Sequence, residues 1–62
     1  MEYVALERRL KNAGCCLMRT GKRHTIWYSP ITGKNFTVPR GVEYLLPRTA
    51  QAIQEIAGIL YG

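Results

Sequence analysis

The feature that most constrains the fold is a pair of amphipathic segments, one near each end of a chain of 62 residues. Apolar residues at helical spacing form one stripe in each segment: Tyr3, Leu6, Leu10 and Ala13 in the first, and Ile53, Ile56, Ala57 and Leu60 in the second. A helix with an apolar stripe has to bury it against another element. Because a chain this short forms one domain at most, we expect residues 1–62 to be a single domain with both helices packed on the same central structure.

Local signals predict where each helix begins and ends. The first helix is expected over residues 2–13, because Gly14 suits the left-handed conformation that follows many helices. The second helix is expected to begin at Thr49, a typical N-cap residue that comes shortly after Pro47. Gly58 interrupts the apolar pattern and is a candidate for the end of this helix.

Three short segments between the helices have the composition of β-strands. They cover residues 15–20, 24–29 and 35–39, and the residues between them are rich in turn formers. Short turns join successive strands in antiparallel order. The predicted fold is therefore of the α+β class, an α-β-β-β-α domain in which two helices cover one face of a three-stranded antiparallel sheet.

Alternation along residues 24–29 divides the side chains between two faces of the sheet. One set is His24, Ile26 and Tyr28, and the other is Thr25, Trp27 and Ser29. If Ile26 faces the helices, His24 lies at the rim of the core and Trp27 lies on the open face. An exposed Trp27 would stack on a nucleic-acid base, cover apolar surface or contact a partner protein.

Positive charge is concentrated in the middle of the chain. The formal net charge is +5, and residues 15–40 hold five basic residues and no acidic one: Arg19, Lys22, Arg23, Lys34 and Arg40. Residues 1–14 and 41–62 have net charges of +1 and −1. Such a basic segment suits a polyanion, most simply nucleic acid, and is equally compatible with a solubilising surface.

Residues that the sequence lacks exclude several kinds of chemistry. There is no Asp and the four Glu residues are scattered, so the converging carboxylates of a two-metal nuclease are missing. One His and the adjacent Cys15 and Cys16 do not make a zinc site, and both cysteines are expected to be small buried residues of the first strand. No Gly-rich phosphate loop occurs either. Taken together, these absences mean that no metal or other cofactor is expected. No signal-peptide pattern or membrane-spanning apolar run is seen, which predicts a cytoplasmic protein.

His24 is the only imidazole of the chain, and basic residues directly precede it. RNA carries its own nucleophile, the 2′-hydroxyl, so a ribonuclease needs a general base for that proton and cations for the charge that develops on the phosphate. His24 would be the base, with basic neighbours as the cations. The acid that protonates the leaving 5′-oxygen stays open between Lys22, Tyr28 and water.

Four sequence elements follow one another in a distinctive order. They are Gly21-Lys22-Arg23-His24, the aromatic segment from Ile26 to Pro30, Val38-Pro39-Arg40, and a helix led by Thr49 that ends near Gly58. In the order and spacing of these elements, the chain resembles the HicA family of bacterial toxins from about residue 3 to residue 59. Members of this family are mRNA interferases of type II toxin–antitoxin systems.

The resemblance implies a fold like that of double-stranded-RNA-binding domains, and cleavage of mRNA with arrest of translation. It implies that His24 is the catalytic residue of an endoribonuclease, and the basic residues expected to hold phosphate are Lys22, Arg23, Arg19 and Arg40. It also implies a HicB-type antitoxin that blocks the toxin and contacts operator DNA, with the toxin as co-repressor. Trp27 and Tyr28 are the candidates for base stacking or for contact with the antitoxin.

One position departs from the family pattern. Many relatives have a second His directly after Val-Pro-Arg, where this chain has Gly41, so a mechanism with two histidines of one chain is excluded. Two other functions stay open. One is a non-catalytic RNA-binding module on the same fold, and the other is an interaction protein that acts mainly as a co-repressor subunit.

Overall fold

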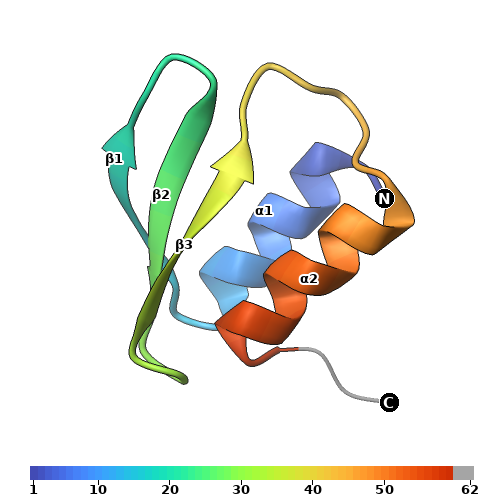
Figure 1. Cartoon of the computed structure of the whole chain (residues 1–62). Helices are drawn as coiled ribbons and strands as arrows, with labels where there is room; N and C mark the ends of the chain where they lie inside the picture. The colour runs from blue at the N-terminus through green and yellow to red at the C-terminus, as the bar shows by residue number, and fades with distance from the viewer. Residues whose placement is uncertain (60–62) are drawn as a thin grey trace.

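The computed structural model describes residues 1–59 and has the predicted α-β-β-β-α order (Figure 1). The elements are α1 (Tyr3–Asn12), β1 (Cys16–Thr20), β2 (His24–Ser29), β3 (Lys34–Pro39) and α2 (Pro47–Ala57). The three strands form one antiparallel sheet in the order β1-β2-β3, as a chain of short hairpins dictates. The predicted small α+β domain is confirmed.

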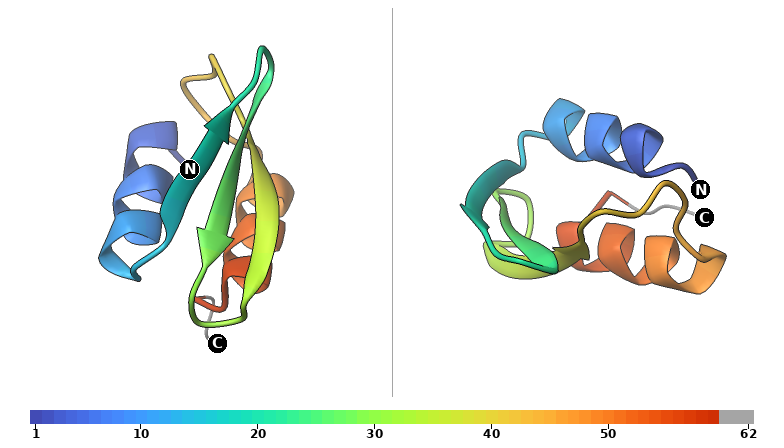
Figure 2. Two further views of the ribbon diagram at one scale, coloured as in Figure 1. Left: turned by 90° about the vertical axis from the view of Figure 1, so that its left-hand side faces the viewer. Right: turned by 90° about the horizontal axis from the view of Figure 1, so that it is seen from above.

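Both helices lie on the same side of the sheet, so the molecule has two layers. They run side by side in the same direction, and the opposite face of the sheet carries no helix (Figures 1 and 2). The guanidinium of Arg9 on α1 donates a hydrogen bond of 2.7 Å to Oε1 of Gln54 on α2 and joins the two helices. No helix among residues 1–59 is long and apolar enough to cross a bilayer.

The two helices end where Gly14 and Gly58 predict, but the second helix does not begin where Thr49 predicts. Gly14 follows α1 with φ of +89°, and Gly58 caps α2 with φ of +79°, as the sequence predicts. The prediction that Thr49 caps α2 is wrong. The helix begins two residues earlier, because Pro47 has a backbone preset for the first helical position and loses no hydrogen bond there.

The buried face of α2 agrees with the predicted stripe at Ile53 and Ala57 but not at Ile56. The buried residues of α2 are Ala50, Ile53, Gln54 and Ala57, whereas Ile56 is 44% exposed. Gln54 tolerates burial because its side chain is hydrogen-bonded to Arg9 and to the carbonyl of Ala50. Leu60, the last member of the predicted stripe, lies outside the described residues.

The core fills the space between the sheet and the two helices. Its buried residues come from every element except β1: Leu6, Leu10, Cys15, Trp27, Phe36, Val38, Leu45, Ala50, Ile53 and Ala57. The prediction for the cysteines is half right. Cys15 is buried in the connection after α1, but Cys16 begins β1, all of whose residues are exposed.

The conditional placement of the β2 side chains is wrong, and the two faces are exchanged. Trp27, only 2% exposed, faces the helices together with Thr25 and Ser29. The register explains this result, because Trp27 pairs with Phe36 and Thr25 pairs with Val38, so all four side chains share the buried face. His24, Ile26 and Tyr28 therefore lie on the open face, and Trp27 is not available for stacking on a base or for contact with a partner.

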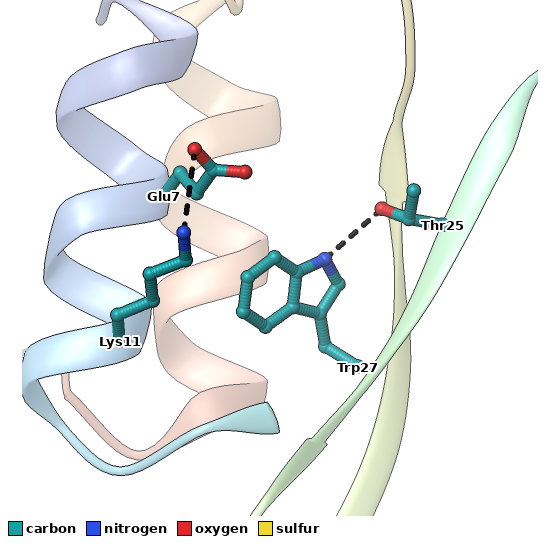
Figure 3. A network of polar contacts seen from close by, with 4 residues as sticks. All are labelled: Glu7, Lys11, Thr25 and Trp27. Carbon is teal, nitrogen blue, oxygen red and sulfur yellow. Dashed lines mark hydrogen bonds and ion pairs between the residues drawn. The ribbon is translucent and has the colours of Figure 1, made fainter. Parts of the chain in front are cut away.

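The buried indole is accommodated by a hydroxyl on its own strand. Trp27 Nε1 donates a hydrogen bond of 3.0 Å to Thr25 Oγ1, as Figure 3 shows. The Thr25 hydroxyl in turn donates to the carbonyl of Val38 on β3. The only polar group of the indole is thus satisfied inside the core, which removes the main penalty for burying a tryptophan.

Candidate functional site

His24 begins β2 at the turn that joins it to β1, and its side chain is exposed on the open face of the sheet. A hollow of about 330 Å³ lies beside it. Its lining comprises the predicted imidazole, three of the predicted cations and three further residues: His24, Arg19, Lys22, Arg23, Gly21, Ile26 and Thr37. The structure therefore brings together most of the site that the sequence suggests.

Arg19 reaches this hollow because β1 contains a bulge. Leu17 pairs with Trp27 and Arg19 pairs with Ile26, so Met18 is an extra residue on β1. A bulge of this kind changes which side chains of a strand share a face. Arg19 consequently lies opposite Ile26, on the open face that also carries His24.

Three hydrogen bonds fix the turn between β1 and β2. The Gly21 N–H donates to the His24 carbonyl at 2.8 Å, and the Arg40 N–H donates to the Arg23 carbonyl at 2.8 Å. The Arg40 guanidinium donates to the Gly21 carbonyl at 2.6 Å. Arg40 therefore contacts the turn but is not among the residues that line the hollow.

Gly21 is suited to this turn by its size. A Cβ at this position would lie 3.0 Å from the His24 carbonyl oxygen, which is closer than ordinary contact. Its φ is not positive, so the turn requires the small size of glycine here and not a left-handed backbone. A glycine here lets the turn close tightly enough to bring Lys22 and Arg23 up to the imidazole.

The charge of the site is not neutralised by carboxylates. Within residues 1–59 the one ion pair joins Lys11 to Glu7 on α1, with Nζ and Oε1 3.9 Å apart (Figure 3). Arg19, Lys22 and Arg23 are exposed and are free to meet an anion. In the same part of the chain, no three His, Cys or acidic side chains come together in a way that would hold a metal ion.

Tyr28 and Gly41 are the remaining positions to which the sequence analysis gave a role, and neither lines the hollow at His24. Tyr28, a candidate acid and stacking residue, lies half-buried on the open face but does not line the hollow. Gly41 has φ of +77°, a conformation that strains residues with a side chain. A histidine at this position, as the family pattern has it, would need a different local backbone.

A second and larger hollow, of about 560 Å³, lies between β3 and α2. His24 and Thr37 line both hollows, so the two adjoin at these residues. Sequence analysis missed the second hollow, and Arg48, Thr49 and Ile56, which line it, were not assigned to a site. Ile56 is exposed and lines this hollow, although the sequence pattern places it in the apolar stripe of the helix.

Comparison of the chain with protein-family models, with curated proteins and with solved structures finds no match in any of the three.

Proposed function

We propose that this protein is a metal-independent endoribonuclease of the HicA toxin type, which cleaves mRNA and thereby arrests translation. The observation that carries the proposal is the hollow in which His24 lies with Arg19, Lys22 and Arg23, unpaired with any described carboxylate. A general base surrounded by cations matches what RNA cleavage through the 2′-hydroxyl requires.

The proposed reaction is transesterification within the RNA chain. The His24 imidazole accepts the proton of a 2′-hydroxyl, and the 2′-oxygen attacks the adjacent phosphorus. The charge on the phosphoryl oxygens is stabilised by Arg19, Lys22 and Arg23, the guanidinium groups being suited to paired contacts with phosphate. The bond to the 5′-oxygen breaks, and this oxygen takes a proton from Lys22 or water, leaving a 2′,3′-cyclic phosphate and a 5′-hydroxyl.

The proposed partner is an antitoxin of the HicB type, and this part of the proposal rests on the sequence resemblance. An antitoxin that covers the exposed His24 would stop cleavage by excluding RNA from the hollow. In such a system operator DNA is contacted through the antitoxin, with the present protein as co-repressor.

The site also supports a second candidate function, a non-catalytic RNA-binding module. One observation favours it: a single imidazole and no carboxylate line the hollow. The site therefore lacks a second group of the kind that usually acts as general acid when a histidine acts as general base. The same cations would then hold the RNA backbone without cleaving it.

The test is incubation of the purified full chain with a defined mRNA and with DNA of the same sequence, both in excess EDTA. We expect the RNA to be cut and the DNA to stay intact, because only RNA supplies the 2′-hydroxyl. Loss of RNA cleavage on chelation would contradict a metal-independent enzyme. Binding of intact RNA without cleavage would support the second candidate.

A further inference from the structure

We propose that the hollow between β3 and α2 is a nucleotide-binding subsite that takes an unstacked base of single-stranded RNA next to the phosphate at His24. This inference rests on the proposed function and deepens it, because it assigns the source of base preference to a named surface. Most of the residues that line this hollow belong to the edge strand β3 and to α2. These two elements lie side by side in the fold (Figures 1 and 2).

The position of this hollow next to the first one is the first argument. His24 and Thr37 belong to the lining of both hollows. An RNA chain whose phosphate lies against Arg19, Lys22 and Arg23 therefore has its next nucleotide at the entrance of the second hollow. The volume of about 560 Å³ is within the roughly 300–1,000 Å³ of small-molecule sites.

The chemistry of the lining is the second argument. Pro39, Ala52 and Ile56 supply apolar surface for the faces of a base, and the buried Phe36 and Ile53 lie beneath them. Asn35, Thr37 and Thr49 supply amide and hydroxyl groups for its edges, and none of these three side chains is engaged in the hydrogen bonds of the described residues. Single-stranded RNA is recognised by this combination of apolar contact and hydrogen bonds to base edges.

Charge is the third argument, and it favours RNA over a protein partner as the occupant. Arg48 lines the second hollow, and no acidic residue lines either hollow. Cations thus lie on both sides of His24, as expected for a surface that follows a phosphate backbone. The apolar side chain of Ile56, 44% exposed on α2, would be covered by the base.

The test uses 2′-O-methyl oligoribonucleotides of A, C and U, which lack the free 2′-hydroxyl and are not cleaved. Their affinities for the full chain are measured by fluorescence anisotropy at one salt concentration. Ala52→Phe fills the subsite from an exposed position of α2. Gln51→Phe is the matched control, since Gln51 is exposed on the same helix and does not line the hollow.

We expect the native chain to discriminate between the best and worst oligonucleotide by about tenfold, a size typical of one well-held base. Because the Phe side chain fills the subsite, Ala52→Phe should reduce this ratio of affinities to less than about threefold, whereas Gln51→Phe should keep the native ratio. A second variant, Asn35→Ala, removes an edge contact without adding bulk and should change the order of preference.

Four outcomes would overturn the inference, and only the last of them also overturns the proposed function. If the native chain binds all three oligonucleotides equally, or if Ala52→Phe keeps the native preference, the subsite is wrong while RNA cleavage can still stand. If no oligonucleotide binds but mRNA is cut in EDTA, the subsite is again wrong. If RNA is neither bound nor cut, both the proposed function and the subsite are wrong. The hollow between β3 and α2 would then be a candidate interface with a protein.

Discussion

At the scale of single residues, the hydroxyl of Thr25 allows β2 to turn its tryptophan inward. It accepts a hydrogen bond from Trp27 Nε1 and donates one to the carbonyl of Val38. With the indole satisfied in the core, the next residues along the strand, Ile26 and His24, are directed to the open face. The exposure of the proposed catalytic imidazole thus depends on a buried residue beside it.

We predict that Thr25→Val lowers the free energy of unfolding by about 1–3 kcal/mol, because it leaves a buried indole N–H without an acceptor while nearly conserving volume. Urea denaturation measures the change. Thr20→Val is the matched control, since Thr20 is an exposed threonine of β1 and its change should be within about 0.5 kcal/mol. Equal stabilities of the two variants would mean that the Thr25–Trp27 hydrogen bond contributes little.

Sequence reasoning found the chemistry-bearing residues but not the direction in which they point. Lys22, Arg23 and His24 are adjacent in the chain, so any tight turn keeps them together. Alternation separates His24 and Ile26 from Trp27, but it does not say which set is buried. That choice depends on the register with β3, where Phe36 lies opposite Trp27.

At the scale of elements, the turn between β1 and β2 is held by a residue that follows β3. His24 pairs with Pro39, so the next residue, Arg40, lies beside Arg23 and reaches the Gly21 carbonyl. This contact joins residues that are 19 positions apart. Arg40 was expected to hold phosphate as part of the Val38-Pro39-Arg40 element of the family resemblance, and no local sequence pattern reveals a long-range hydrogen bond.

We predict that Arg40 acts as a positioning residue. Arg40→Ala should lower kcat for RNA cleavage by about ten- to a hundredfold, since small displacements of reacting groups are costly, but should change the affinity for 2′-O-methyl RNA by less than about twofold. Arg40→Lys, which keeps one donor near the Gly21 carbonyl, should restore part of kcat.

Lys34→Ala is the control for this prediction. Lys34 is an exposed lysine of the same basic segment, residues 15–40, and it lines neither hollow. This substitution should leave kcat and affinity unchanged. If Arg40→Ala instead weakens RNA binding with kcat preserved, Arg40 is a phosphate ligand, as the sequence alone suggests, and its bond to Gly21 is incidental.

At the scale of the whole molecule, the fold separates a packing side from an open side. The helices and the inward-facing side chains of β2 and β3 form the core, and the open face carries His24 with Arg19, Lys22 and Arg23. Three of the five cations of the basic segment, Arg19, Lys22 and Arg23, thus lie around the end of the sheet at which β2 begins. A charged surface without carboxylates is the arrangement expected for a protein that meets a nucleic acid.

The architecture was predictable for a physical reason. Two amphipathic helices and three short strands are specified by local periodicity, and 62 residues leave few ways to bury both apolar stripes. The hollow between β3 and α2 was not predictable, because it depends on how the last helix packs on the edge strand. A helix start that differs by two residues, at Pro47 instead of Thr49, accompanies the exposure of Ile56.

The central claim is that His24 performs the chemistry while the surrounding cations bind the RNA. The most direct measurement compares the native chain with His24→Ala for two quantities, the rate of mRNA cleavage in EDTA and the affinity for 2′-O-methyl RNA over a range of salt concentrations.

The account predicts that His24→Ala loses cleavage but binds RNA nearly as the native chain does, with log K falling by about 0.7 per phosphate contacted for each unit of log salt. Equal cleavage by both proteins, or a binding constant that does not depend on salt, would contradict it.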